Sequence, residues 1–396
     1  MIVDLVSEHA DPLAAIGSAV TGGQNVHVAG LAGALAARGH TVTVHTRRTS
    51  PDQPGSAAMA EGVTVEYVPA GPAVPLPKHE LLRHMPAFAG HLARRWAADR
   101  PDVVHAHFWM SGLAALAAAR GVSVPVVQTY HALGTVKRRW QGVADPSPPQ
   151  RVKAETDIGM RADAIVATCH DEAEELRAMG VSMSRVRVVP CGVDLDLFRP
   201  DGPIAPRDGD RCRVLSIGRL VPRKGVDTLV EALRDVPHAE LVIAGGGPDD
   251  EEVRRLARLA ARRAVADRVR LLGGVARADV PALMRSADVL VTVPWYEPFG
   301  MVPLEAMACG VPVIASAVGG HLDTVTGCGL LVPPRRPRVL ARALRDLLDD
   351  PGLRAVLEKS GERRVQARYG WPKVAEAVET VYVNVLSARR RRPATA

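Results

Sequence analysis

The chain is poor in aromatic side chains, which make up only 4% of its 396 residues. Nucleic-acid-binding surfaces commonly combine basic residues with aromatic rings on which bases stack. The formal charge of +7 does not by itself predict such a partner, because four of the positive charges belong to the single run from Arg389 to Arg392. Blocks of like charge tend to stay solvated, so residues 389–396 are expected to form a disordered basic tail. We therefore expect no nucleic-acid partner.

Cysteine is also scarce and shows no pairing pattern. The five cysteines are scattered along the chain, and no two of them stand at a C-x-x-C spacing. Disulfide frameworks and zinc sites both depend on regular cysteine spacing. We therefore expect reduced thiols that serve only as packing residues.

Long hydrophobic runs are missing as well. Glycine, proline or charged residues interrupt every apolar stretch well before the roughly 18 residues that a membrane-spanning helix needs. The first residues, Met1-Ile2-Val3-Asp4-Leu5-Val6, have no basic segment and enter a strand-like run at once. A secretory signal would begin differently. The expectation is a cytoplasmic protein without integral membrane association.

The chain does contain a repeated alternation of short apolar runs with helical patterns. Strand-like runs occur at residues 42–44, 63–65, 103–104, 124–127, 164–166, 186–189, 214–217, 241–244, 269–272, 289–293 and 311–314. A polar segment rich in proline and glycine, around residues 198–210, interrupts this alternation and is the best candidate for a linker between two lobes. The pattern is typical of doubly wound parallel sheets. We predict an α/β fold with two Rossmann-like lobes, over residues 1–199 and 210–370, and a ligand site in the cleft between them.

A dinucleotide-binding fingerprint is absent. Gly22 and Gly23 precede a helix soon after the first strand, but they do not form a G-x-G-x-x-G motif. The second strand ends in Val44-His45-Thr46-Arg47, without the acidic residue that would bind a ribose. A helix N-terminus preceded by glycines still favours an anion, so Gly23 is a candidate phosphate contact. The alternative is a simple flexible turn.

Two cations follow the first strand of the second predicted lobe. Arg219 offers a fork of N–H donors for phosphate oxygens, and Lys224 adds a point charge five residues later. The run Gly245-Gly246-Gly247 follows the next strand and allows a ligand to approach the backbone closely. These features favour a diphosphate site, with a solvated basic turn as the alternative.

Two glutamates eight residues apart follow a later strand. Glu297 lies in the loop after this strand, and Glu305 is expected to begin the next helix, so both carboxylates point to the same end of the sheet. A carboxylate accepts two hydroxyl hydrogen bonds at once, which suits the diols of a ribose or hexose. The alternative is that both are surface residues, although the apolar surroundings make unpaired burial costly.

Three histidines follow neighbouring strands. His131 comes after the strand near residue 127 and is predicted to face the cleft, while His105 and His107 form an H-x-H pair at the end of the preceding strand. Since no carboxylate or cysteine stands at ligand spacing, we predict no metal site. Packing and polar loop roles are the alternatives for all three.

Together these stretches resemble family 4 of the retaining GT-B glycosyltransferases, and the resemblance covers nearly the whole chain. It implies a UDP-sugar donor and no metal or other cofactor. The residues that it assigns to the donor are Gly23, Arg219, Lys224, Gly246, Glu297, Phe299, Gly300, Met301 and Glu305. Those that it assigns to catalysis are His131, Glu297, Arg219 and Lys224.

The resemblance also implies a C-terminal helix, residues 371–388, that crosses back to the first lobe. One motif departs from the family. Where its members commonly read Gly-Gly-x-x-Glu, this chain reads Gly319-Gly320-His321-Leu322-Asp323.

Within this family, the chain is most similar to the mycothiol-pathway branch, which transfers N-acetylglucosamine to an inositol phosphate. The shared features are Gly-Gly-x-Asn at residues 22–25, an H-x-H-aromatic-Trp-x-Ser-Gly run at residues 105–112, and Val136-Lys137. The acceptor positions implied by this resemblance are Asn25, Lys78, Phe108, Ala132 and Arg151.

Two of these acceptor positions lack a hydroxyl that the branch carries. Phe108 replaces a tyrosine and Ala132 replaces a threonine, which should weaken phosphate binding by roughly 1 to 3 kcal/mol. We therefore expect a hexosyltransferase that moves glucose or N-acetylglucosamine to an unphosphorylated aminocyclitol, such as 2-deoxystreptamine in aminoglycoside antibiotic synthesis. The alternatives are an inositol-phosphate transferase, a UDP-sugar epimerase and a two-lobed binding protein. The sequence leaves open whether the chain forms a homodimer.

Overall fold

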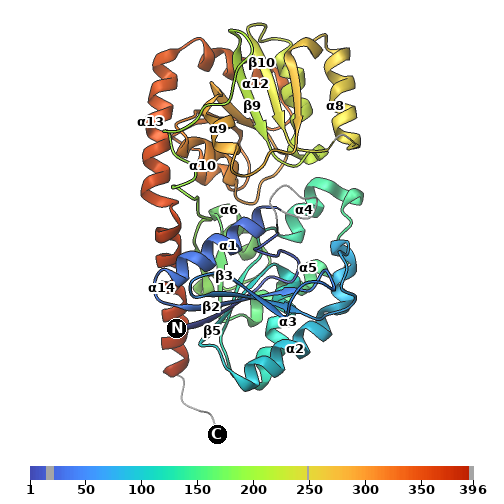
Figure 1. Cartoon of the computed structure of the whole chain (residues 1–396), viewed down its shortest axis with the longest axis vertical. Coiled ribbons are helices and arrows are strands. Elements are labelled where there is room, and N and C mark those ends of the chain that lie inside the picture. The colour runs from blue at the N-terminus through green and yellow to red at the C-terminus, as the bar shows by residue number, and fades with distance from the viewer. Residues whose placement is uncertain (15–21, 248, 392–396) are drawn as a thin grey trace. The chain divides into compact units, whose positions relative to one another are not determined.

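The computed structural model describes residues 1–14, 22–247 and 249–391. The chain divides into two compact units, unit 1 with residues Met1–Gly192 and Trp371–Ala396, and unit 2 with residues Val193–Gly370. Each unit is a sheet flanked by helices (Figure 1). The predicted α/β fold with two Rossmann-like lobes is confirmed.

The sheet of unit 1 has the strand order β3-β4-β2-β1-β5-β6-β7-β8. Its strands are β1 (Ile2–Val6), β2 (Thr41–Arg47), β3 (Ser56–Ala60), β4 (Val63–Val68), β5 (Val103–His107), β6 (Val126–Thr129), β7 (Ala164–Ala167) and β8 (Val186–Val188). All pairs are parallel except β3 with β4. The edge strand β3 was not predicted, because its Ser-Ala-Ala-Met-Ala sequence lacks β-branched residues.

Helices cover both faces of this sheet. They are α1 (Gly23–Ala36), α2 (Met85–Ala98), α3 (Trp109–Ala118), α4 (Gly134–Gln141), α5 (Arg151–Arg161), α6 (His170–Ala178) and α14 (Trp371–Arg390). Alternate residues of a strand point to opposite faces. Accordingly, Val103 packs in the core cluster beneath α1 and α14, whereas Val104 packs in the cluster beneath α2 and α3. Burial on both faces explains why these strands are continuous apolar runs.

Unit 2 has a six-stranded, fully parallel sheet in the order β11-β10-β9-β12-β13-β14. Its strands are β9 (Cys212–Ile217), β10 (Ala239–Ala244), β11 (Val269–Gly273), β12 (Val289–Thr292), β13 (Val313–Ser316) and β14 (Leu330–Val332). Its helices are α7 (Val226–Leu233), α8 (Glu251–Arg262), α9 (Val280–Arg285), α10 (Met301–Ala308), α11 (His321–Thr324), α12 (Pro337–Leu348) and α13 (Pro351–Arg368). Short 3₁₀ turns complete the two units, and Lys78–His84 is the longest of them.

The segment near residues 200–209 belongs to unit 2, where the sequence analysis placed a linker between the lobes. The guanidinium of Arg285 donates hydrogen bonds to the carbonyl oxygens of Arg199 and Pro203. The amide of Ala205 also donates to the carbonyl of Ala282 at 2.9 Å. These bonds hold the proline-rich segment against α9, so unit 2 begins earlier than predicted.

Helix α14 packs against unit 1, beside α1 (Figure 1). The helix continues through Arg390, so the prediction of a disordered tail that begins at Arg389 is wrong for these two residues. Arg389 is held because its guanidinium donates to both carboxylate oxygens of Asp163, at 3.0 and 2.9 Å. Residues 392–396 of the predicted tail lie outside the described residues.

The cysteines agree with the expectation of reduced thiols that serve as packing residues. All five cysteines are free thiols, and every one except Cys212 is buried. None of the helices among the described residues has both the length and the hydropathy needed to cross a membrane.

The first residue of α14 packs directly on two glycines of unit 1. A Cβ atom at Gly30 would lie 2.1 Å from Cε2 of Trp371, and one at Gly192 would lie 2.4 Å from Cδ2 of the same indole. The indole also contacts the ring of His27 edge-on, at a centroid distance of 5.6 Å. Close approach to glycine therefore anchors the start of the C-terminal helix.

We predict that Gly30→Ala destabilises the protein by roughly 1 to 3 kcal/mol, the usual cost of overpacking a core. Gly33→Ala is the matched control, because it lies in the same helix and its Cβ would meet nothing within 4 Å. Alanine has the higher helix propensity, so the control should be neutral or slightly stabilising. Urea unfolding of both variants measures the difference, and equal stabilities would contradict the proposed anchor.

Candidate functional site

Several predicted site residues follow two strands that are neighbours in a sheet but not consecutive in the chain. In unit 2, β9 and β12 are neighbours although β10 and β11 come between them along the chain, and in unit 1, β1 and β5 are neighbours although β2, β3 and β4 come between them. At such a point the following loops diverge to opposite faces, which leaves a crevice at the carboxyl ends of the strands. Arg219 and Lys224 follow β9, and Glu297 follows β12.

The structure brings Lys224 and Glu297 together as an ion pair, with 2.5 Å between Nζ and Oε2. The two side chains are only 24% and 13% exposed. Burial lowers the pKa of the Lys224 ammonium, against the opposing effect of the Glu297 carboxylate. Burial alone would raise the pKa of Glu297, but the charge of Lys224 and the neighbouring His321 outweigh it, so this pKa is lowered. The two groups thus form a largely buried ion pair.

Arg219 is exposed and forms no hydrogen bond or ion pair with any of the described residues. The carboxylate of Glu297 pairs with Lys224 instead, so the N–H groups of the Arg219 guanidinium have no acceptor among the described residues. Its fork of donors is thus available to an anion that reaches the carboxyl end of β9.

The Gly319-Gly320 turn packs against the backbone of the Glu297 loop. A Cβ atom at Gly319 would lie 2.1 Å from the carbonyl oxygen of Glu297, and one at Gly320 would lie 2.2 Å from that of Phe299. The amide of Gly320 donates to the Glu297 carbonyl at 3.0 Å. Only glycine permits this approach, so the two glycines of the departing motif position the Glu297 loop.

His321, which the sequence analysis did not assign to the site, is fully buried beside this loop. Its Nδ1 lies 3.0 Å from the carbonyl oxygen of Ser316, and its Nε2 has no partner among the described residues. A Cβ atom at Gly300 would lie 2.6 Å from the imidazole Cδ2. The place of His321 in a motif that departs from the family was the available signal.

The remaining residues of unit 2 that were predicted to bind the donor lie at loop and helix ends. Gly300 is the N-cap of α10, with φ of 93°, and Met301 is the first residue of the helix. The first amides of a helix have no partner within it, so those at Phe299, Gly300 and Met301 suit an oxygen-rich ligand. Gly246 follows β10, with φ of 72°.

Glu305 lies in the middle of α10, which starts at Met301, so the prediction that Glu305 begins this helix is wrong. Its carboxylate pairs with the guanidinium of Arg277 at 2.6 Å, and only 6% of its side chain is exposed. Burial raises the pKa of Glu305, which Arg277 opposes. Arg277 in turn lies over the ring of Phe198, at 4.5 Å from the centroid. The sequence carried no signal for this arginine.

In unit 1, a buried polar group follows β1 directly. The carboxylate of Glu8 lies 2.7 Å from Nδ1 of His9 and accepts a hydrogen bond from the Ser111 hydroxyl. The imidazole of His9 contacts the ring of Phe108 edge-on, at 4.8 Å. The polar triplet Ser7-Glu8-His9 after an apolar strand was a signal that the sequence analysis did not use.

Phe108 is the centre of the predicted acceptor residues. The guanidinium carbon of Arg151 lies 5.1 Å from its ring centroid, and the Lys78 ammonium lies 5.8 Å from it. Arg151 pairs with Glu155 at 2.7 Å and donates to the carbonyl oxygen of Ala132 at 2.6 Å. The structure thus brings together four of the five predicted acceptor residues.

Asn25, the fifth, serves the start of α1. Its side-chain oxygen accepts from the amide of Gly22 at 3.1 Å, and its nitrogen donates to the carbonyl of Asp11 at 2.9 Å. Gly23 is the first helical residue, so its amide belongs to the anion-favouring end of α1. Thr21, which precedes this turn, lies outside the described residues.

The half-buried His131 belongs to a chain of imidazoles with the buried His107 and His105. Its Nε2 lies 2.9 Å from Nδ1 of His107, whose ring in turn lies 4.3 Å from that of His105. His105 hydrogen-bonds to the Tyr382 hydroxyl of α14 at 2.8 Å. The H-x-H pair is therefore part of a packed polar network, and burial lowers the pKa of all three imidazoles.

Phe108 and His131 share a strained backbone. Their φ angles are 79° and 60°, in the left-handed region that non-glycine residues rarely adopt. Each follows the carboxyl end of its strand, β5 and β6 respectively. Strain of this kind concentrates at binding sites, where the surroundings enforce it.

One ring nitrogen from each of His27, His107 and His131 lies within 4.8 Å of the others. Neutral imidazoles are good ligands for zinc and related ions. A hydrogen bond between Nδ1 of His107 and Nε2 of His131 links two of these three imidazoles.

Comparison with known proteins agrees with this geometry. The profile described as Glycosyltransferase Family 4 matches residues 21–197, and that described as Glycosyl transferases group 1 matches residues 203–364. A D-inositol 3-phosphate glycosyltransferase of Xylanimonas cellulosilytica is 39% identical over 99% of this chain and 98% of its own. That of Acidothermus cellulolyticus is 38% identical over 98% of this chain and 91% of its own.

Two solved structures show the same architecture. The sucrose-phosphate synthase of Thermosynechococcus elongatus superposes with a TM-score of 0.90 and 34% identity, over 98% of this chain and 99% of its own. Anabaena HepE in complex with UDP and glucose shares the fold, with a TM-score of 0.76 and 20% identity over 97% and 99% of the chains. The chain belongs to family 4 of the retaining GT-B glycosyltransferases, and it is a hexosyltransferase rather than an epimerase or a binding protein.

The buried imidazoles predict how stability depends on pH. Burial lowers the pKa of His27 to about 4 and that of His105 to about 3, from an ordinary value of 6.5. Between pH 6.5 and 4 the unfolded chain binds protons that the folded chain does not, so stability falls as the pH falls. Each histidine contributes up to about 3 kcal/mol to this loss.

We predict that His27→Leu flattens the decline in unfolding free energy between pH 6.5 and 4, as measured by urea unfolding at several pH values. His238→Leu is the control, because it removes a histidine whose side chain is 40% exposed. If the unfolding free energy of the His27 variant fell as steeply with pH as that of the unchanged protein, other groups would be its cause.

Proposed function

We propose that this chain transfers a hexosyl group from a UDP-sugar to D-inositol 3-phosphate. The relatives that match almost the whole chain carry that activity in their names. The observation that supports it most directly is the convergence of Lys78 and Arg151 on Phe108 in unit 1. Two cations beside one aromatic ring, of which Arg151 also pairs with Glu155, attract a phosphate and repel a protonated amine.

This proposal replaces the aminocyclitol acceptor expected from the sequence. An aminocyclitol is a polycation near neutral pH and needs carboxylates that are free to pair with its amines. Two carboxylates beside this cluster already have partners, because Glu155 pairs with Arg151, and Glu8 bonds His9 and Ser111. The hydroxyls missing at Phe108 and Ala132 weaken phosphate binding without creating a site for amines.

For the donor, we assign the diphosphate to Arg219 and Lys224 of unit 2. A departing nucleoside diphosphate gains negative charge in the transition state, and fixed cations stabilise that charge without a metal. Glu297 then binds sugar hydroxyls with the amides of Phe299, Gly300 and Met301, and Gly23 and Gly246 offer backbone amides to the donor. Glu305 accepts from the ribose hydroxyls, and His131 lies against the donor sugar.

We predict that Arg219→Ala, Lys224→Ala and Glu297→Gln each lower turnover by about 10²-fold, since each removes a contact that strengthens in the transition state. Lys359→Ala is the matched control, because this lysine is exposed on α13. Release of UDP, followed in the presence of a chelator, measures turnover. Normal activity of the Arg219 and Lys224 variants would refute the diphosphate assignment.

The acceptor assignment has its own test. Lys78→Met should lower kcat/KM for inositol 3-phosphate by about 10-fold or more, since an ion pair with phosphate contributes a charge-assisted hydrogen bond. The rate with unphosphorylated inositol should not change. Phe108→Tyr, which adds a hydroxyl beside the same cations, should lower KM for the phosphorylated acceptor. Preferential glycosylation of 2-deoxystreptamine in a competition assay would instead restore the aminocyclitol reading.

A further inference from the structure

A second basic site lies in unit 1, away from the residues assigned to catalysis. It is a pocket of about 310 Å³ between the ends of β7 and β8, the end of α5 and the last turns of α14. Asp163 and Arg185 precede β7 and β8, so the pocket opens at the amino ends of the strands. Phe108 and His131 follow the carboxyl ends of β5 and β6, at the opposite edge of the same parallel sheet.

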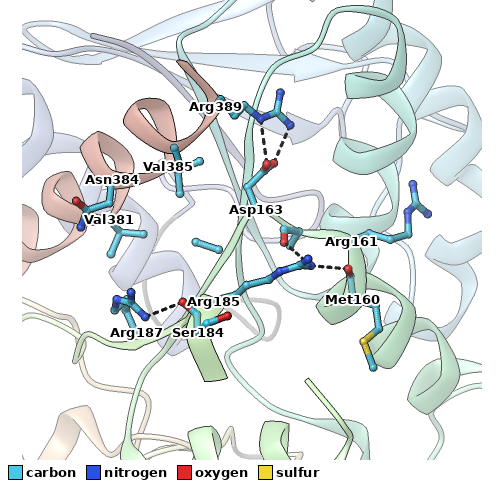
Figure 2. A pocket seen from close by; sticks show the side chains of 13 residues that line it. Met160, Arg161, Asp163, Ser184, Arg185, Arg187, Val381, Asn384, Val385 and Arg389 are labelled. Atoms are coloured by element: carbon cyan, nitrogen blue, oxygen red, sulfur yellow. Dashed lines mark hydrogen bonds and ion pairs between the residues drawn. The ribbon is translucent and has the colours of Figure 1, made fainter. Parts of the chain in front are cut away.

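Four arginines and one aspartate line this pocket, namely Arg161, Arg185, Arg187, Arg389 and Asp163. Figure 2 shows Arg389 directed at Asp163, so this one arginine is neutralised. No other lining residue is acidic. The pocket therefore carries an excess of positive charge that no described carboxylate balances.

Backbone carbonyls, not acids, hold two of the arginines in place. One terminal nitrogen of Arg185 donates to the carbonyl oxygen of Met160 at 2.6 Å. One terminal nitrogen of Arg187 donates to the carbonyl oxygen of Ser184 at 3.0 Å (Figure 2). The same nitrogen donates to the carbonyl oxygen of Val186 at 2.8 Å. A carbonyl orients a guanidinium without neutralising it. The other donors of each fork have no partner among the described residues.

Part of the pocket lining is apolar. Val381 and Val385 project from α14, with Asn384 beside them (Figure 2), and Ala164 begins β7. A site of this volume lies at the lower end of the range for small-molecule sites. Oriented guanidinium forks match the geometry of phosphate oxygens, and an apolar wall accommodates an uncharged portion of a ligand.

We propose that this pocket binds a small phosphorylated anion with at least two negative charges, of the diphosphate class. The site is separate from the donor diphosphate residues, which belong to unit 2. The inference depends on the charge and geometry of unit 1 alone, so it stands or falls independently of the acceptor assignment.

Calorimetric titration with inorganic pyrophosphate tests the proposal. The full chain with Arg219→Ala and Lys224→Ala serves as the background, because these substitutions remove the two cations assigned to the donor. Pyrophosphate should bind this background, and added salt should weaken the binding. Adding Arg161→Gln and Arg187→Gln should weaken it at least 10-fold. Both side chains are exposed and form no ion pair with a described residue, so the fold should persist, which thermal unfolding checks.

Arg258→Gln with Arg262→Gln in the same background is the matched control, because it removes the same charge from exposed positions of α8. Equal loss of binding in the two double variants, or no binding to the background, would overturn the proposal. Binding to anionic phospholipid vesicles without binding of pyrophosphate would overturn it too, and would assign the arginines to a membrane surface. Tighter binding of UDP than of pyrophosphate would support it and identify a nucleotide as the ligand, whereas equal binding would identify the diphosphate group alone.

Discussion

The reversal of strand order in each sheet is the constraint on which the candidate site depends. Chain segments that leave neighbouring strands in opposite directions cannot cover the edge between them, so that edge stays open to a ligand. In unit 2 the reversal brings Lys224 and Glu297 into contact although 73 positions separate them. In unit 1 it places Glu8, after β1, against Ser111, which follows β5. The chemistry of both units thus follows from topology before any single side chain is considered.

Packing then sets the geometry of these loops. The Gly319-Gly320 turn lies so close to the Glu297 loop that any larger residue would displace the carboxylate. In unit 1, Phe108 and His131 adopt left-handed backbone angles where the chain leaves β5 and β6. Strain at one point is tolerated because the surrounding core is close-packed and cannot relax locally.

Much of this was accessible from the sequence, because parallel strands buried on both faces read as apolar runs, and cations or carboxylates after such runs stand out. Arg219, Lys224 and Glu297 were found in this way. Contacts between segments that are distant in the sequence were not found in this way. Examples are the ion pair of Arg277 with Glu305 and the hydrogen bond of Tyr382 with His105. Our proposal departs from the aminocyclitol acceptor for a related reason. Two missing hydroxyls were visible in the sequence, but the bonds that engage Glu8 and Glu155 were not.

Tyr382 of the last helix bonds His105 of β5, so unit 1 is complete only when the end of the chain has been made. Unit 1 is assembled from two stretches of chain, and all of unit 2 is inserted between them. During synthesis, the face of α1 that later packs on α14 remains uncovered until unit 2 has left the ribosome. Domains generally fold as units while the chain emerges. Unit 2 is therefore the first part of this protein able to complete its core, and unit 1 must wait with an exposed apolar groove for its own last helix.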